Sequence, residues 1–438
     1  MNCLTNNESE AILEGAAASP DHENVDVMYP GLNGRRIAMV TFSCYPGDAR
    51  PRRSIKALLS QGACIDLICL MDGSNPSREN VGALHITRLA IKQRRTGTLA
   101  YVWQYFTFIV QSSLILAVRA SLQRYDLVYV NNMPDILIIS AMVPKALGAK
   151  VILDMHDPMP ELMSTIYSLT AKSTAVRLIA ALEKWSLARA HRVLTVNLAC
   201  KRLFSSRSCS ADKVGVIMNT PDESIFKLNY PARMHASPTP TRRPYVIMYH
   251  GSLVERNGLA LAVEAFAHLR KRVPNTELRI YGRHGLYLDK VLEKARTLDV
   301  DDAVHYLGPK SLDELVTEIR NCDVGVIPNH LNPFTEINTP VRIFEYLSQG
   351  KPVIAPRTHG ILEYFNDDSL ILFEAGSLAD LTSQLYYAYE HPDAVRETII
   401  RGQKVLMAHT WAKERERLLD QVNELVSVRL VGKSLVAL

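Results

Sequence analysis

The chain has 438 residues, of which 47% are hydrophobic and 22% charged, and its net charge is +5. This composition is typical of a folded globular protein rather than a disordered or membrane-spanning one, and the length indicates two domains. Residues 1–34 hold six acids and no Lys or Arg, which leaves 50 basic and 39 acidic side chains, a net +11, for the rest. Such a charge favours anionic partners: nucleotide phosphates, an acidic lipid surface or nucleic acid.

The N-terminus and the cysteines indicate a cytoplasmic location. Seven cysteines without a CxxC pair suggest reduced thiols. Residues 1–33 lack the basic and apolar regions of a signal peptide, so we expect a flexible acidic tail. The longest apolar stretch, residues 101–118, carries Gln104 and Gln111, which favours a buried or interfacial helix over a membrane span.

Strand-like apolar runs alternate with helical patterns along both halves of the chain. In the first half the runs lie at 36–42, 64–70, 127–130, 150–155, 192–197 and 213–218, and a second series follows the proline-rich stretch at 228–244. This alternation predicts an α/β fold with two doubly wound, Rossmann-like domains. We predict domains over 34–220 and 221–410, and a terminal segment, 411–438, whose helix packs back on the first domain.

The most informative segment is 338–355, which reads as a helix between two buried strands. Thr339 and Pro340 open the helix and Gly350 ends it. Glu345 then lies at the sheet edge where α/β proteins bind ligands. Its carboxylate can accept hydrogen bonds from both hydroxyls of a ribose.

The segment 250–266 runs from a strand end through a loop into a helix. Backbone amides after Gly251 and the side chain of Arg256 can converge there on a diphosphate. Arg283, after the next strand, and Arg342, one turn before Glu345, are candidates for the same site. In the alternative interpretation Arg256 is a solvated loop residue and the glycines only make turns.

In the first half, polar residues gather after the strand 150–155. His156 can donate a hydrogen bond to a sugar hydroxyl, and Asp157 or Glu161 can orient it or the acceptor. Gly47 and Arg50, after the first strand, are expected on the acceptor side as well. Glu161 alternatively caps the following helix. Because consecutive residues leaving a strand do not easily converge on one ion, we expect no metal site.

Five blocks in order, YPGDARPRR, HDPMPE, VIMNTPDESIF, HGSLVERNG and FEYLSQGKPVIA, resemble the retaining glycosyltransferases of family four, which have the GT-B architecture. The resemblance implies a nucleotide-sugar donor on the C-terminal domain and a glycan or lipid-linked glycan acceptor on the N-terminal domain. It also implies retaining transfer in the cleft between them, without a metal or other cofactor, and catalytic roles for His156, Arg256 and Glu336. One departure is that Ile337 takes the place of the family's first glutamate, and Glu336 is displaced by one position.

Two other functions stay open: a non-catalytic nucleotide-sugar-binding or membrane scaffold protein, and a sugar-nucleotide epimerase. We also expect peripheral binding at an anionic membrane surface and no nucleic-acid partner. The membrane expectation rests on the basic and aromatic residues Arg88, Lys92, Arg94, Arg95, Tyr101, Trp103, Tyr105, Phe106 and Phe108. Alternatively, those aromatic side chains form the core face of a helix.

Overall fold

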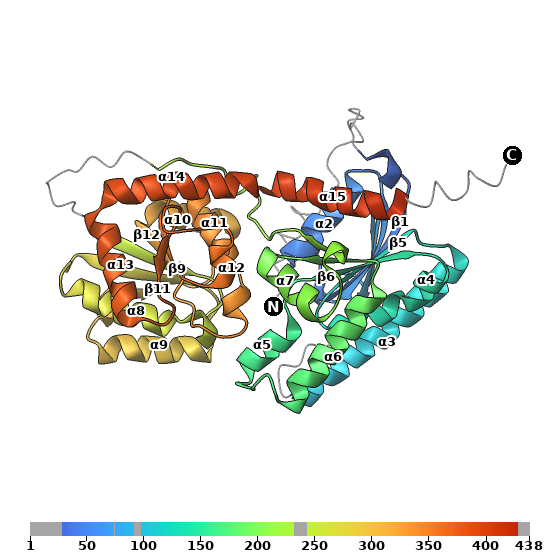
Figure 1. Ribbon diagram of the computed structural model, residues 1–438, viewed down its shortest axis with the longest axis horizontal. Helices are drawn as coiled ribbons and strands as arrows, with labels where there is room; N and C mark the ends of the chain where they lie inside the picture. The colour runs from blue at the N-terminus through green and yellow to red at the C-terminus, as the bar shows by residue number, and fades with distance from the viewer. Residues whose placement is uncertain (1–28, 74, 92–97, 232–242, 428–438) are drawn as a thin grey trace. The chain divides into compact units, whose positions relative to one another are not determined.

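The computed structural model describes residues 29–73, 75–91, 98–231 and 243–427, which fold as two compact units (Figure 1). The N-terminal unit contains the described residues up to Val196, Lys201–Ile217 and the chain from Glu414 on. The C-terminal unit contains Asn197–Cys200 and Met218–Lys413. The two sheets are doubly wound and Rossmann-like, as the alternating pattern predicts.

The N-terminal unit has an eight-stranded sheet in the order β3-β4-β2-β1-β5-β6-β7-β8. All its strand pairs are parallel except β3 with β4. The strands are β1 (Arg36–Cys44), β2 (Cys64–Leu70), β3 (Arg78–Val81), β4 (Leu84–Leu89), β5 (Leu127–Asn131), β6 (Lys150–Met155), β7 (Arg192–Thr195) and β8 (Val214–Val216). Strands β2 and β5 are buried almost throughout, since helices cover both faces of a parallel sheet.

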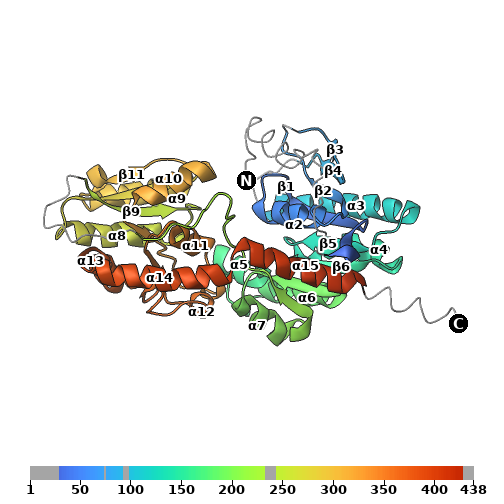
Figure 2. The ribbon, with the colours of Figure 1, turned by 90° about the horizontal axis from the view of Figure 1, so that it is seen from above.

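The strand order fixes which face each helix covers. The chain runs from β1 to β2 in one direction and from β4 to β5 in the other, so right-handed crossovers put α2 and α3 on opposite faces. Figures 1 and 2 show α3, α4 and α6 on one side of the sheet and α2 with α15 on the other. The helices are α2 (Ala49–Leu59), α3 (Thr98–Leu122), η2 (Asp135–Ala141), α4 (Met142–Ala146), α5 (Met159–Ile166), α6 (Thr174–Arg189), α7 (Leu198–Arg207) and α15 (Trp411–Ser427).

The two ends of the described chain meet on the N-terminal unit. Residues 30–32, expected to belong to the tail, form a 3-10 helix, η1, and Leu32 is fully buried, so the ordered unit begins before residue 34. Helix α15 packs beside it: the Tyr29 hydroxyl donates to Asp420 at 2.9 Å, and Arg192 pairs with Glu424 at 2.7 Å.

The C-terminal unit has a six-stranded parallel sheet in the order β11-β10-β9-β12-β13-β14. Its strands are β9 (Tyr245–His250), β10 (Thr276–Tyr281), β11 (Val304–Tyr306), β12 (Val324–Val326), β13 (Val353–Pro356) and β14 (Ile371–Phe373). Its helices are η4 (Glu255–Asn257), α8 (Leu259–Arg270), α9 (Leu286–Thr297), α10 (Leu312–Asn321), η6 (Thr335–Ile337), α11 (Val341–Ser348), α12 (His359–Leu362), α13 (Leu378–Glu390) and α14 (Pro392–Ala408). The central strand β9 is buried from Val246 to His250, and its apolar side chains belong to the core.

The structure contradicts part of the predicted membrane-binding set of basic and aromatic residues between Arg88 and Phe108. Arg88 lies in β4, is buried and pairs with Glu79 of β3 at 2.7 Å, so it is not a surface cation. Tyr105 and Phe108 of α3 pack on Phe42 of β1, with ring centroids 4.7 and 5.1 Å away; Phe108 is fully buried and Tyr105 partly buried. The other basic residues of the cluster, Lys92, Arg94 and Arg95, lie outside the described residues.

Candidate functional site

In the C-terminal unit, polar side chains gather where the strand order reverses, between β9 and β12. Open α/β sheets bind ligands at this switch point, outside the carboxyl ends of the strands. Gly258 brings the loops after the two strands together: its φ is +67°, and an added Cβ would lie 1.9 Å from the carbonyl oxygen of Pro328. The His330 amide also donates to the Arg256 carbonyl at 3.1 Å.

Glu345 faces this edge from α11. The helix begins at Val341 rather than at Pro340, which is its N-cap, and the Thr339 hydroxyl, expected to cap the helix, donates to the Gly360 carbonyl at 2.6 Å instead. The Glu345 Oε2 atom lies 3.5 Å from Nε2 of His250, the last residue of β9. Burial and the nearby charge of Arg342 lower the pKa of His250 to about 3, so its imidazole is neutral near pH 7.

Arg342 holds the end of β9 in place. Its Nη1 donates to the His250 carbonyl at 2.7 Å, and its guanidinium lies 5.1 Å from the ring centroid of Tyr249. Gly251, with φ of +126°, lets the chain turn beneath this side chain: an added Cβ would lie 3.2 Å from the Arg342 Cδ. Arg342 therefore positions the loop that begins at Gly251.

Arg256 is the cation best placed for an anionic ligand. Its guanidinium lies 5.8 Å from the ring centroid of Phe334, and within the described ranges no carboxylate pairs with it. Arg283 follows β10 and is exposed. The edge thus combines a half-buried carboxylate with arginine side chains on neighbouring loops, which suits a ligand with both hydroxyls and phosphates.

Glu336, an expected catalytic residue, has a partner of its own. It lies in η6 and pairs with Nδ1 of His359, the first residue of α12. The Glu336 carboxylate is therefore paired with His359, whereas the Glu345 carboxylate lies near His250.

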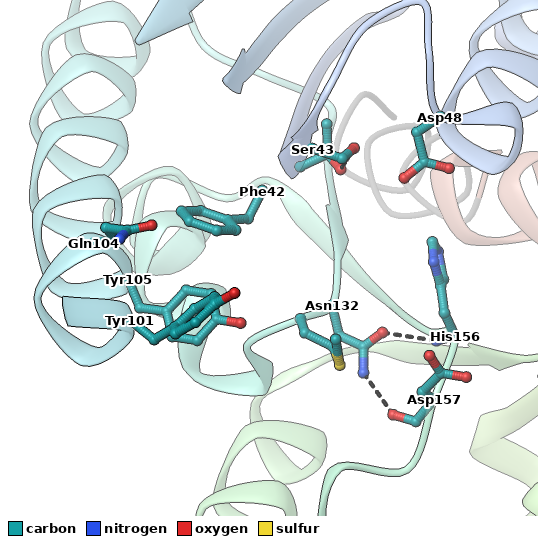
Figure 3. A pocket seen from close by; sticks show the side chains of 11 residues that line it. Phe42, Ser43, Asp48, Tyr101, Gln104, Tyr105, Asn132, His156 and Asp157 are labelled. Atoms are coloured by element: carbon teal, nitrogen blue, oxygen red, sulfur yellow. Dashed lines mark hydrogen bonds between the residues drawn. The ribbon is translucent and has the colours of Figure 1, made fainter. Parts of the chain in front are cut away.

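The N-terminal unit has a pocket of about 550 Å³ at its own switch point, between β1 and β5 (Figure 3). In Figure 3, Tyr101, Gln104 and Tyr105 reach it from α3, while Asp48, His156 and Asp157 lie across from them. The lining residues are Thr41, Phe42, Ser43, Asp48, Tyr101, Gln104, Tyr105, Asn132, Met133, His156 and Asp157. Aromatic rings and carboxylates line it together.

Asn132 organises the far wall of this pocket. Its Oδ1 accepts from the His156 amide at 2.7 Å, and its Nδ2 donates to the Asp157 carbonyl at 2.9 Å (Figure 3). The His156 Nε2 atom lies 3.6 Å from Oδ2 of Asp154, too far for a hydrogen bond, and has no hydrogen-bond partner among the described residues. This nitrogen is buried and faces Asp154. His156 and Asp157 both line the pocket, and their roles stay predictions.

Arg50 does not serve as an acceptor-side cation. It is buried, and its Nε donates to Asp154 at 3.2 Å while its Nη1 donates to the Ile217 carbonyl at 3.3 Å. The prediction is wrong because the Arg50 guanidinium binds both carboxylate oxygens of Asp154, near the end of β6, two strands from β1. Gly47, one turn earlier, is an exposed turn residue where an added Cβ would meet nothing closer than 3.6 Å.

Glu161 likewise has a structural partner. Its carboxylate accepts two hydrogen bonds from Arg207, at 2.6 and 2.9 Å, and the same guanidinium binds the buried Glu183. The network ties α5, α6 and α7 together and leaves Glu161 outside the lining of the pocket. Glu161 therefore has a structural partner, but that partner is Arg207 rather than the start of its own helix, where no side-chain cap is formed.

Two buried aspartates near this pocket have opposite pKa shifts. Burial alone would raise the pKa of Asp154, but the charges of Arg50 and His156 hold it well below its usual range. Burial raises the pKa of Asp135 to about 7, against a hydrogen bond from Asn132 that lowers it. Asp135 therefore titrates near neutral pH. It accepts a hydrogen bond from Asn132, which in turn accepts one from the His156 backbone amide.

Sequence reasoning missed His250 and Asn132. His250 reads as the end of an apolar strand, and Asn132 as part of a loop. The signal for both was position: His250 ends β9 and Asn132 directly follows β5, and both strands border a switch point. Among the described residues, no group of three or more His, Cys, Asp or Glu side chains is arranged to hold a metal ion.

The two halves of the chain match two known domain families. Residues 48–220 match the family described as "Glycosyl transferase 4-like domain", and residues 233–405 match "Glycosyl transferases group 1". A D-inositol 3-phosphate glycosyltransferase from Corynebacterium kroppenstedtii is 29% identical over 185 residues, which are 40% of this chain and 39% of that protein. The chain thus spans less than half of this relative's length.

Solved structures share the fold over most of the chain. Sucrose-phosphate synthase from Thermosynechococcus elongatus has a TM-score of 0.70 and 18% identity, with 90% of this chain and 100% of that chain covered. HepE from Anabaena in complex with UDP-glucose has a TM-score of 0.65 and 15% identity, with 89% and 99% covered. These likenesses show a GT-B fold.

Proposed function

Because the chain belongs to the family-four-type glycosyltransferases with the GT-B fold, we propose that it transfers a sugar, with retention, from a nucleotide-sugar donor to a glycan or lipid-linked glycan acceptor. The observation that carries the proposal is the β9–β12 edge, where Glu345 lies beside the neutral His250 and Arg256 stands on the loop that follows β9. The UDP-glucose bound by the structural neighbour HepE supports a donor of this class.

The donor's nucleoside diphosphate is assigned to the C-terminal unit. Glu345 accepts hydrogen bonds from the two ribose hydroxyls, and His250, whose Nε2 lies 3.5 Å from its carboxylate, limits where that carboxylate points. Arg256 binds the diphosphate, joined by the amides of the loop that follows Gly251. Arg342 keeps this loop in place through the His250 carbonyl.

The acceptor is assigned to the pocket of the N-terminal unit. Its aromatic residues Phe42, Tyr101 and Tyr105 offer apolar faces to a sugar ring, while Asp48 and Asp157 accept from its hydroxyls. His156, which lines the same pocket, donates a hydrogen bond to a hydroxyl of the donor sugar or acceptor. Its backbone is fixed through Asn132, so the imidazole is presented by a rigid strand end.

In the retaining reaction proposed here, the bond between the sugar carbon and the diphosphate breaks while the acceptor oxygen bonds to the same face of that carbon. The acceptor proton leaves with the departing diphosphate. The main task of the protein is then to stabilise the negative charge on the leaving group. One well-placed donor such as Arg256 contributes on the order of 3 kcal/mol in a water-poor site. This chemistry needs no metal ion in its steps.

A thermal-shift screen with UDP-glucose, GDP-mannose and ADP-glucose tests the donor class, followed by turnover of the stabilising compound with and without EDTA. We expect one nucleotide-sugar to raise the melting temperature, sugar transfer to survive EDTA, and the product to keep the donor's anomeric configuration. Loss of all activity on chelation with recovery on adding Mn²⁺ would refute the metal-independent mechanism. An inverted product would refute retention.

A further inference from the structure

One side of α3 exposes apolar side chains along its whole length. Six of them are spaced four residues apart, and at 1.5 Å per residue this row spans about 30 Å. Together with Trp103 they are seven exposed apolar residues on one helix, more than the scattered hydrophobic residues of an ordinary surface. This α3 apolar face consists of Val102, Trp103, Phe106, Val110, Leu114, Val118 and Leu122, with side chains between 39% and 84% exposed.

The other side of α3 is part of the core. Phe108, Ser112 and Leu116 are fully buried, and Phe108 packs on Phe42 of β1. Among the described residues α3 is the helix that is long and apolar enough to cross a membrane, but 28% of its most apolar window is buried in the protein. Crossing would strip that buried side from the sheet. The helix therefore suits an orientation along a surface.

The apolar face continues onto the neighbouring helices. Ile139 of η2, Val143 of α4 and Leu178 of α6 are exposed, and η2 packs against both α3 and α6. Figure 1 shows α3, α4 and α6 on the same side of the sheet. The exposed apolar residues thus belong to one helical layer rather than to separate places on the unit.

The charge on this layer is positive. Lys172, Arg177 and Lys184, in and before α6, are exposed. Within the described helices of the layer, Asp135 and Glu183 are buried and Glu161 is bound to Arg207, so the acids do not offset these cations at the surface. A second copy of the same face would bring like charges together, whereas anionic headgroups would balance them.

We propose that the α3 apolar face lies in the interfacial region of an anionic lipid bilayer, with the exposed cations of α6 among the headgroups. Helices of this type bury their apolar side at the boundary between headgroups and acyl chains. The surface differs from the one the sequence suggested, because Arg88 and Phe108 are buried and Tyr105 faces the pocket, while Trp103 and Phe106 are exposed, their rings 5.6 Å apart.

Flotation with vesicles tests this proposal on the full chain, without donor or acceptor, so its outcome is separate from that of the sugar-transfer assay. The parent protein should float with vesicles of 30% phosphatidylglycerol in phosphatidylcholine. Phe106→Glu with Leu114→Glu should reduce the bound fraction at least tenfold. Leu286→Glu with Leu312→Glu, which places the same charges on exposed leucines of the C-terminal unit, should float like the parent.

Two further measurements identify which residues contact the lipid. Brominated acyl chains should quench the fluorescence of Trp103, and Trp103→Phe should remove that quenching while binding persists. Arg177→Glu with Lys184→Glu should abolish the preference for anionic over neutral vesicles. A parent that stays in the soluble fraction overturns the proposal, as does a Phe106→Glu, Leu114→Glu variant that is folded and floats normally. A parent dimer that this variant dissociates would show instead that the face binds a second copy.

Discussion

The two sheets each collect polar side chains where their strand order reverses, but they use arginine differently. In the C-terminal unit, Arg256 lies on the loop after the first strand without a carboxylate partner among the described residues. In the N-terminal unit, Arg50 follows the first strand in the same way and is buried against Asp154. An arginine that follows a strand is therefore a ligand-binding candidate only if no carboxylate at the end of another strand of the sheet pairs with it.

The largest expected effect is a pH dependence that differs between the two units. Burial depresses the pKa of His250 to about 3, below its ordinary 6.5, so the folded C-terminal unit binds this proton less tightly than the unfolded chain. The stability that depends on neutral His250 is present above pH 6.5 and lost as pH falls towards 3, by up to about 5 kcal/mol. Urea unfolding at pH 7.5 and 5 should show this loss in the parent and a smaller one in His250→Gln.

For Asp135 in the N-terminal unit we predict the opposite change of stability with pH. Its pKa is raised from 3.8 to about 7, so the stability due to its proton is present below pH 3.8 and lost as pH rises through 7. The full difference is up to about 4 kcal/mol. Relative to the parent, Asp135→Asn should be more stabilising at pH 8 than at pH 5 in the same urea titrations. An equal effect at both pH values would mean that Asp135 does not titrate there.

The same substitution at the two strand-end arginines should separate their roles. Arg50→Met leaves Asp154 buried without its cation and should lower the free energy of unfolding by about 3–5 kcal/mol. Arg256→Met should change stability by less than about 0.5 kcal/mol and weaken nucleotide-sugar binding instead. Urea midpoints and titration calorimetry measure the two effects. A comparable loss of stability in both variants would contradict the contrast between the units.

His156 should affect turnover more than binding. The residue lines the N-terminal pocket, so His156→Ala should lower kcat by about 100-fold while donor affinity stays close to that of the parent. His305→Ala, at a partly exposed histidine of the C-terminal unit, is the matched control and should leave kcat unchanged. Collapse of nucleotide binding in His156→Ala would assign the residue to the nucleotide site or to a structural role.

The sequence was sufficient for the two doubly wound sheets because buried parallel strands are near-continuous apolar runs, as in β9, and their ends mark where ligands bind. It was insufficient where a role depends on a distant partner. Arg50 meets Asp154 from 104 positions away, and Glu161 meets Arg207 from 46. Arg88 was misread because the short hairpin that pairs it with Glu79 has a weak strand pattern. No local spacing encodes such pairings.

The central claim is that the nucleotide-sugar binds at the β9–β12 edge through Glu345. Titration calorimetry with UDP-glucose, or with whichever of the three screened nucleotide-sugars stabilises the parent, tests it in Glu345→Gln and Glu336→Gln. The account predicts at least tenfold weaker binding for Glu345→Gln, since a charge-assisted hydrogen bond is worth about 1.5–3 kcal/mol. It also predicts near-parental affinity for Glu336→Gln, whose carboxylate is engaged by His359. Unchanged binding in a folded Glu345→Gln variant would contradict it.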